Sequence, residues 1–306
     1  MGKLQDFMTI SMAKIQLGTL PHATLGIFLA AGGLHELANW SILVYIALYF
    51  VLITFACNIN CLYDYEVDRK YKTYHSDAID RLGFGTVRRI ILLEVVLALI
   101  LIAYLFANRH YVTGTLALLG LFFSYAYSAS PVRLKKRGVL SPLPVLIGLY
   151  TLPLLGGWFL LDKPVLGYFI LFVVGYALMN EGFTLVNTCE DYAEDKSEGI
   201  KTWAHVFGMR RTLALALIFS LGGFLSLGIL AFAWLPSFSF ASPKEIVTLF
   251  LIAVLTVALV VSILQVNRAR VGENLEVSAK LYAKKMPRWF MTTRYPMLFI
   301  ALLIIV

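Results

Sequence analysis

The chain has 306 residues, of which 59% are hydrophobic and only 14% are charged, and its mean hydropathy is +0.79. This composition lies far outside the range of soluble globular proteins and predicts an integral membrane protein. The formal net charge of +8 does not call for a nucleic acid partner. The basic residues lie between apolar segments, where membrane lipids and an anionic substrate are sufficient partners.

Apolar runs long enough to cross a bilayer recur along the whole chain, and no long polar linker separates them. The expected spans cover residues 15–34, 41–59, 90–107, 112–129, 139–161, 165–186, 212–235, 246–266 and 289–306. The last span is the weakest, because it contains Arg294 and Pro296 and its fully apolar part, from Met297 onward, is too short to span alone. We expect an all-α, polytopic membrane bundle of about nine transmembrane helices, with residues 1–306 forming one domain.

The basic residues are divided unevenly between the two sides of this expected bundle. Of the 26 Lys and Arg residues, all but Arg109, Lys163 and Lys244 fall on the side that holds the N-terminus if nine spans alternate. Cytoplasmic loops collect Lys and Arg, so we expect the N-terminus to be cytoplasmic. We expect no cleavable signal peptide, because the first apolar run begins late and is long enough to span.

One polar pattern, Asn-x-x-x-Asp-x-x-x-Asp, occurs twice, each time at the end of an apolar segment. The two copies consist of Asn60, Asp64 and Asp68, and of Asn187, Asp191 and Asp195. A step of four residues turns by only about 40° on an α-helix, so each copy is expected to line one helix face over roughly two turns. Carboxylates beside hydrocarbon are costly unless they are paired or bind a cation. The repetition therefore indicates two acidic helix ends that share a divalent cation through oxygen ligands.

Cations and glycines follow both copies on the expected cytoplasmic side. The basic residues of these loops include Arg69, Lys70, Lys72, Arg81 and Lys201, and the loop after the expected span 112–129 adds Arg133 and Lys135 on the same side. Such a setting suits a metal-bridged polyphosphate, because the metal neutralises phosphate oxygens while Arg and Lys clamp them. We also expect residues 69–85 to form a loop that caps the site and closes when substrate and metal are bound.

Other readings of these residues remain open. Lys136 and Arg137 lie beside an expected span and are interpreted as topology signals. Cys57, Cys61 and Cys189 are interpreted as small packing residues, since the sequence offers the first two no partners of a tetrahedral zinc site. Paired acidic helices also occur in secondary transporters, where they form a cation or proton pathway. Transporter sites tend to lie near the bilayer midplane, whereas these acids cluster at one face.

Taken together, these residues resemble the UbiA-type intramembrane prenyltransferases. The resemblance rests on the two acidic copies, on Tyr127-Ser-x-x-Pro-x-Arg-Leu-Lys135, and on Asp191-x-x-x-Asp195-x-x-x-Gly199-x-Lys201-Thr202. It implies a helical bundle around a central cavity, in which Mg²⁺ bridges the acidic copies to an isoprenyl diphosphate. It also implies transfer of the prenyl group to a lipophilic acceptor, either an aromatic ring or a glyceryl phosphate lipid precursor.

The resemblance and the charge pattern together predict roles for individual residues. Matched by position to the family motifs are Asn60, Asp64, Asp68, Asp191, Asp195, Arg133 and Lys135, and the acidic repeat and the neighbouring basic loops extend this set. The metal ligands would be Asn60, Asp64, Asp68, Asn187, Asp191 and Asp195. The diphosphate would be bound by Asn60, Arg69, Lys72, Tyr127, Arg133, Lys135 and Lys201. Loss of diphosphate would be assisted by Asp64, Asp191, Lys135 and Arg81. Many members carry an Arg-Pro-Leu-Pro-Ser-Gly-like run after the first copy, whereas this chain has His75-Ser-Asp-Ala-Ile-Asp-Arg81, which leaves the acceptor open.

Overall fold

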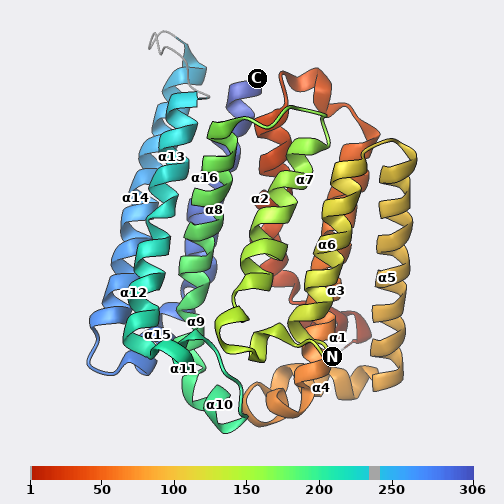
Figure 1. Ribbon diagram of the computed structural model, residues 1–306, viewed down its shortest axis with the longest axis vertical. Coiled ribbons are helices and arrows are strands. Elements are labelled where there is room, and N and C mark those ends of the chain that lie inside the picture. Colours follow the sequence, from red (N-terminus) through yellow and green to blue (C-terminus); the bar gives the residue numbers. More distant parts are fainter. Residues whose placement is uncertain (1, 234–241) are drawn as a thin grey trace.

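The structure, a computed structural model, describes residues 2–233 and 242–306. Within these residues every regular element is helical, and the only β-type pairing is one bridge between Arg137 and Lys201. The long helices run side by side in one bundle, with short helices gathered at one of its ends (Figure 1). The predicted all-α fold is confirmed.

The helices follow one another from the N-terminus to the C-terminus as follows. The first part of the chain forms α1 (Lys3–Ile10), α2 (Ala13–Ala30), η1 (Leu34–Leu37), α3 (Trp40–Tyr71), α4 (Thr73–Leu82), α5 (Phe84–Ala107) and α6 (Tyr111–Ser128). The middle part forms η2 (Leu134–Lys136), η3 (Gly138–Leu140), the π-helical η4 (Pro144–Thr151), α7 (Leu152–Phe159), α8 (Gly167–Leu185), α9 (Asn187–Glu190) and α10 (Tyr192–Ser197). The last part forms α11 (Trp203–Phe207), α12 (Met209–Ser220), α13 (Gly222–Ala233), α14 (Pro243–Val271), α15 (Leu275–Ala283) and α16 (Met286–Ile305).

Seven helical stretches in the described part of the chain are long and apolar enough to cross a membrane. They are α3, α5, Gly138–Phe159, Gly167–Glu190, Met209–Phe232, α14 and α16. Two further helices of 18 residues, α2 and α6, pack among them. The protein is therefore an integral membrane protein, but the expected number of about nine spans is not confirmed. The end of the expected span 212–235 lies outside the described residues.

The last expected span, which the sequence supported least, forms a continuous helix, α16. It runs without interruption for 20 residues, with Pro296 inside it. The Arg294 side chain is 1% exposed, because it points into the bundle rather than toward lipid. Its Nε donates to Asn180 Oδ1 at 2.6 Å, its Nη1 donates to the Gly18 carbonyl at 2.7 Å, and its guanidinium lies 3.6 Å from the centroid of the Phe290 ring. Hydrogen bonds and ring contact thus offset the cost of placing this charge in the membrane zone.

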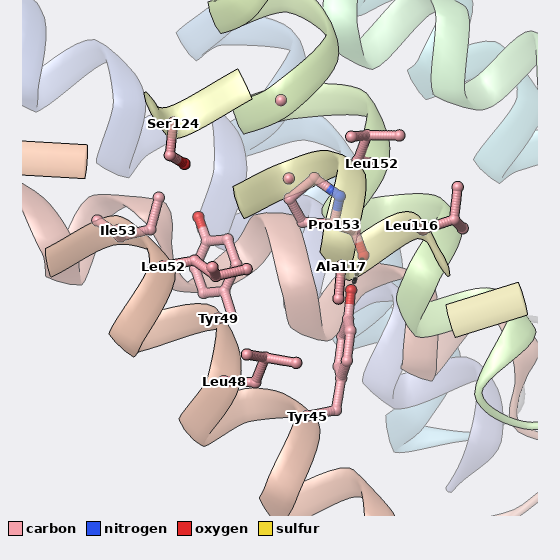
Figure 2. A pocket seen from close by; sticks show the side chains of 12 residues that line it. Tyr45, Leu48, Tyr49, Leu52, Ile53, Leu116, Ala117, Ser124, Leu152 and Pro153 are labelled. Carbon is pink, nitrogen blue, oxygen red and sulfur yellow. Dashed lines mark hydrogen bonds between the residues drawn. The ribbon is translucent and has the colours of Figure 1, made fainter. Parts of the chain in front are cut away.

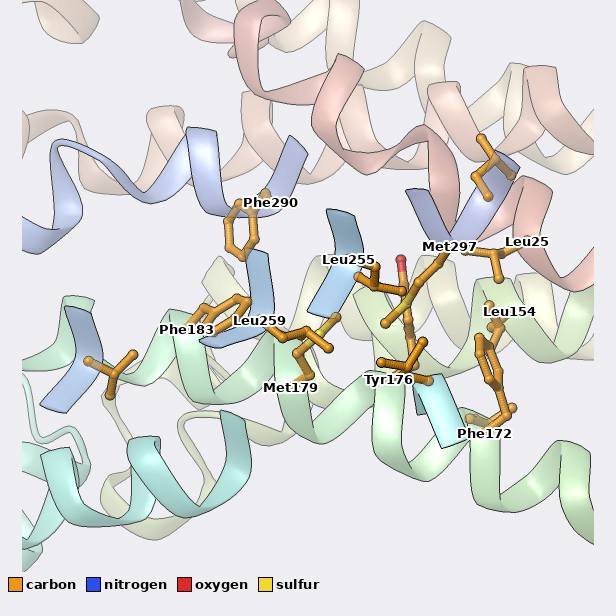
Figure 3. Packing of buried hydrophobic residues seen from close by; sticks show 14 of the residues in the cluster. Leu25, Leu154, Phe172, Tyr176, Met179, Phe183, Leu255, Leu259, Phe290 and Met297 are labelled. Atoms are coloured by element: carbon orange, nitrogen blue, oxygen red, sulfur yellow. The ribbon is translucent and has the colours of Figure 1, made fainter. Parts of the chain in front are cut away.

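The largest apolar core surrounds α8. Figure 3 shows its side chains, among them Phe172 and Met179, packed against residues of α2, α14 and α16. Two glycines let neighbouring backbones approach α8 closely. A Cβ at Gly175 would lie 2.7 Å from the Gly222 carbonyl oxygen, and a Cβ at Gly182 would lie 2.6 Å from that of Ala216. This close packing fixes the helix that leads into the second acidic copy.

The short helices α1, α4, α10, α11 and α15 lie at the same end of the bundle, which we call the polar end (Figure 1). Residues 69–85, predicted as a loop, instead finish α3, form all of α4 and begin α5. The prediction failed because these residues are polar overall, although His75, Ser76, Ala78 and Ile79 form one buried face. This face packs against α1 and α3, so the segment is an ordered helix.

Candidate functional site

The first acidic copy lies on the uninterrupted helix α3, as its spacing predicts. Two cationic side chains from the segment that follows α6 contact the Asp64 carboxylate. Arg133 Nη2 donates to Asp64 Oδ1 at 2.9 Å, and the Lys135 ammonium pairs with Asp64 Oδ2. Asn60 Oδ1 accepts from Lys135 Nζ at 2.8 Å and from Ser128 Oγ at 3.0 Å. These groups form one largely buried polar cluster, since the Asp64 and Lys135 side chains are 14% and 13% exposed.

A sharp turn places the side chains of Arg133 and Lys135 beside the same carboxylate, that of Asp64. Arg133 has a φ of 40°, in the left-handed region, and is the N-cap residue directly before η2. Lys135 follows within η2, and its Nζ lies 5.7 Å from the centroid of the Tyr127 ring. Burial lowers the pKa of the Lys135 ammonium below its ordinary value, although the Asp64 carboxylate opposes this shift. The cluster therefore places a desolvated positive charge beside a negative one.

The second acidic copy departs from the expected continuous helix face. The helix is interrupted at Val186 and again at Asp191, which has φ −89° and ψ 14°. The Asp191 amide still donates to the Asn187 carbonyl at 3.1 Å, and the Asp195 amide donates to the Asp191 carbonyl at 2.8 Å. The four-residue spacing is therefore preserved while the backbone bends. The buried Oδ1 of Asn187 has no hydrogen-bond partner among the described residues.

Electrostatics at the second copy favour a proton or another cation. Burial, together with the neighbouring Asp191 charge, raises the pKa of Asp195 to about 7. Lys72 Nζ lies 3.2 Å from Asp191 Oδ2. Burial disfavours the charged form of Lys72, but the Asp191 carboxylate, together with Glu194 and Glu190, outweighs burial and holds the pKa of Lys72 above its ordinary value. A cation is thus already held by one carboxylate of this copy.

The segment that follows the first acidic copy contacts the second acidic copy and the residues just after it. Besides the Lys72–Asp191 pair, Lys70 Nζ lies 2.8 Å from Glu198 Oε1, and the Tyr71 hydroxyl lies 2.7 Å from Ser197 Oγ. These contacts connect the end of α3 to α10 across the polar end of the bundle. The two acidic copies, far apart in sequence, therefore face a common polar region.

A mainly apolar cavity of about 30 Å³ lies deeper in the bundle (Figure 2). It is lined by Tyr45, Leu48, Tyr49, Leu52, Ile53, Leu116, Ala117, Gly120, Ser124, Gly148, Leu152 and Pro153. Its wall is fixed in part by the Tyr45 hydroxyl, which donates to the Pro153 carbonyl at 2.6 Å. The cavity adjoins α3 on the membrane side of Asn60, so one helix carries both its lining and the first acidic copy.

The sequence model of the UbiA prenyltransferase family matches residues 19–282. The chain belongs to the UbiA prenyltransferase family. Membership assigns it, in general terms, to the enzymes that transfer prenyl groups. No curated protein matches this chain at the level of sequence.

Solved structures of the family share the fold. A UbiA homolog from Archaeoglobus fulgidus bound to GPP and Mg²⁺ is 17% identical, with a TM-score of 0.66 over 95% of this chain and 99% of that one. The apo structure of a UbiA homolog from Aeropyrum pernix K1 is 18% identical, with a TM-score of 0.60 over 90% and 96% of the two chains. A structure concerned with digeranylgeranylglyceryl phosphate synthase is 15% identical, with a TM-score of 0.60 over 99% of both chains. At these identities the comparison establishes the fold and leaves the substrates open.

In this UbiA family member, two groups of predicted site residues gather at the polar end. One contains Asn60, Asp64, Tyr127, Arg133 and Lys135, and the other contains Lys72, Asn187, Asp191 and Asp195.

Other predicted residues are engaged elsewhere. The Arg81 guanidinium is bound by Asp6 of α1, with Nη2 at 2.7 Å from Oδ1. Asp68 Oδ2 lies 3.1 Å from Nδ1 of His75. Arg69 and Lys201 are exposed, and the Lys201 carbonyl accepts from the Gly138 amide at 2.7 Å. The last bond ties the loop after the second copy to the loop that carries Lys135.

Several contributing residues were given no role from the sequence. Ser128 lies inside the stretch that carries the family resemblance, so its position beside Tyr127 was the available signal. His75 lies in the run that departs from the family pattern. Glu198 and Ser197 had no signal, because their partners come from the distant end of α3.

Proposed function

We propose that this protein is a Mg²⁺-dependent intramembrane prenyltransferase. It moves an isoprenyl group from a prenyl diphosphate to a lipophilic acceptor and releases diphosphate. The observation that carries the proposal is the joining of the two acidic copies at one end of the bundle by Lys72, with Arg133 and Lys135 on Asp64. The A. fulgidus homologs bound to GPP or to DMAPP together with Mg²⁺ support it.

The ligand set fits Mg²⁺. Asp64, Asp191 and Asp195 offer carboxylate oxygens, and Asn60 and Asn187 offer amide oxygens, which are the hard ligands that Mg²⁺ prefers. The Asn187 oxygen is buried without a hydrogen-bond partner among the described residues, as expected of an atom that awaits a ligand. When bound, Mg²⁺ would neutralise charge on the diphosphate leaving group. We retain Asp68 as a candidate ligand, although its carboxylate faces His75.

The cationic side chains of the site would bind the diphosphate in place of the carboxylates that they contact in this structure. Lys135 and Arg133 now neutralise Asp64, and Lys72 neutralises Asp191. With these carboxylates engaged by a metal, the three side chains would be available to bind phosphate oxygens. Lys135 acts as a point charge and Arg133 as a planar fork. Tyr127 lies beside Lys135, whereas Arg69 and Lys201 approach from the exposed rim, and Arg81 would have to leave Asp6 to take part.

The membrane interior supplies the remaining requirements. Loss of diphosphate leaves an allylic cation, from which water has to be excluded until the acceptor attacks. The apolar lining of the cavity between α3, α6, η4 and α7 has the chemistry that a prenyl tail requires, but its volume of about 30 Å³ has to widen to admit one. The acceptor is an aromatic ring or a glyceryl phosphate lipid precursor. The whole chain, residues 1–306, forms one membrane domain, with the polar end and the N-terminus in the cytoplasm.

Asp64→Ala and Asp191→Ala test the shared site, with Asp77→Ala, an exposed acid of α4, as the matched control. A labelled prenyl diphosphate is incubated with the purified protein, Mg²⁺ and a panel of phenolic and glyceryl phosphate acceptors. We expect each site variant to lower turnover by at least about 10²- to 10³-fold, because each removes electrostatic stabilisation of the leaving group. The control should stay near wild type. Normal Mg²⁺-dependent turnover in either site variant would refute the shared site.

A further inference from the structure

A second set of metal-ligating side chains lies beside the proposed diphosphate site. Cys61 and Asp68 come from α3, and His75 comes from α4. One ligand atom from each of them lies within 4.8 Å of those of the other two. The three residues are 0%, 7% and 7% exposed, respectively. They form the one such group found among the described residues.

Asp68 differs from Asp64 and Asp191 in the side chains that surround its carboxylate. Asp64 and Asp191 each contact a Lys or Arg, whereas within the described residues Asp68 Oδ2 lies 3.1 Å from Nδ1 of His75. The Cys61 thiol donates to the Ile10 carbonyl at 3.3 Å. The Tyr74 ring lies against the His75 imidazole, with centroids 4.1 Å apart, and is itself 57% exposed. The cluster is thus buried but lies just beneath a surface side chain.

We propose that Cys61, Asp68 and His75 bind a thiophilic divalent cation of the Zn²⁺ class. A thiolate, an imidazole and a carboxylate are ligands that Zn²⁺ takes in proteins, and sets of three leave its fourth position open. Mg²⁺ disfavours sulfur and nitrogen ligands, so the site discriminates against the metal of the neighbouring carboxylates. The site is distinct in chemistry from the oxygen ligands of Asn60, Asp64 and Asp191.

The charges and protons balance without a further reactant. Binding releases the thiol proton of Cys61 to solvent. With Nδ1 of His75 as the ligand atom, the imidazole proton moves to Nε2 and the ring stays neutral. One thiolate and one carboxylate then cancel the two charges of the metal, which is favourable in a poorly hydrated position. Helix α1 holds these three side chains in place in two ways. Its Ile10 carbonyl accepts from the Cys61 thiol, and its Asp6 forms an ion pair with Arg81 of α4.

One consequence rests on the proposed function. Asp68 belongs to the first acidic copy, so a metal bound with Cys61 and His75 would withdraw it from the Mg²⁺-diphosphate site. Zn²⁺ should therefore inhibit prenyl transfer at a fixed Mg²⁺ concentration. Cys61→Ser should relieve this inhibition, and Cys57→Ser should not.

The binding test uses Cd²⁺ as a spectroscopic stand-in for Zn²⁺ and needs no substrate. The purified full-length protein in detergent is titrated with Cd²⁺ while the ultraviolet thiolate-to-metal charge-transfer band is followed. We expect a saturable band in the wild type, its loss in Cys61→Ser, and its retention in Cys57→Ser, in which the altered cysteine lies one helical turn away. His75→Gln should weaken binding by more than roughly 10-fold, because it removes a ligand.

Two further measurements keep the proposal falsifiable if Cys61→Ser does not fold. In the wild type, Zn²⁺ but not Mg²⁺ should compete with Cd²⁺ for the band, and His75→Gln reports on the same site with all cysteines present. If the wild type gives no band, or if the band survives in Cys61→Ser, the site does not exist. Cys61 would then be a packing residue and His75 would only hold Asp68 in place. Because no prenyl diphosphate is present, that failure would leave the proposed prenyl transfer untouched.

Discussion

Lys135 and Lys136 are neighbours in the sequence but have different surroundings. Lys135 is bound by Asp64 and Asn60 within the buried cluster, and its side chain is 13% exposed. Lys136 follows in η2, where its backbone amide donates to the Arg133 carbonyl at 3.1 Å. Lys136 is partly buried but contacts no carboxylate of the acidic copies, whereas Lys135 is aligned with the proposed diphosphate site through Asp64 and Asn60. At the scale of single residues, the structure therefore separates a proposed diphosphate ligand from an adjacent topology signal.

The pair Lys135→Met and Lys136→Met tests this separation. We expect Lys135→Met to lower kcat/KM for the prenyl diphosphate by about 10²-fold or more, because it removes a preorganised charge and leaves Asp64 with one fewer partner. Lys136→Met should change it by no more than about 3-fold, because Lys136 is only partly buried and makes no ion pair with a carboxylate among the described residues. Steady-state kinetics and Mg²⁺-dependent binding of a labelled prenyl diphosphate measure both. Equal losses in the two variants would contradict the assignment.

At the scale of elements, the position of the second acidic copy depends on how α8 packs. This helix is enclosed by α12, α13 and η4, and Gly182 lies five residues before Asn187 at the closest approach to α12. Backbone atoms of Ala216 and Ser220 fill the space in which a side chain at Gly182 would lie. A shift of α8 would therefore move Asn187 and Asp191 away from Lys72.

Gly182→Val tests the packing, with Gly228→Ala of α13 as the control, because a Cβ at Gly228 meets nothing within 4 Å. We expect Gly182→Val to destabilise the protein by about 1–3 kcal/mol or more through overpacking, and to lower activity at the same time. Gly228→Ala should stay within about 1 kcal/mol of wild type. Thermal unfolding in detergent gives the comparison. A Gly182→Val variant as stable as the control would show that α8 and α12 are further apart than described.

At the scale of the whole molecule, the bundle separates two chemically different ends. The polar end carries both acidic copies and the cations that bind them. The opposite end has an ion pair between Lys163 Nζ and Glu36 Oε1 at 3.0 Å. The uneven distribution of Lys and Arg predicts that the polar end faces the cytoplasm.

Labelling of single cysteines in membrane vesicles measures this orientation. Cys57, Cys61 and Cys189 are first replaced by Ser, and then Lys136→Cys or Lys163→Cys is introduced. We expect a membrane-impermeant maleimide to label Lys136→Cys in inside-out vesicles and Lys163→Cys in right-side-out vesicles. The reverse pattern would place the acidic copies outside and would exclude a cytoplasmic prenyl diphosphate as the substrate.

The sequence alone determined the membrane class, the all-α fold, the family and the first acidic copy on one helix face. These features depend on hydropathy and on spacing within one helix, which are local properties. The bend at Asp191, the folding of residues 73–82 into α4 and the capture of Arg81 by Asp6 were decided only by the tertiary structure.

The same holds for the contacts of Lys72 with Asp191 and of His75 with Asp68. A periodic pattern shows which face of a helix is polar, but it does not show which distant side chain meets that face. The packing of the helices decides which side chains meet. A buried charge is costly without a partner, and its partner has to be one of the groups that packing places next to it.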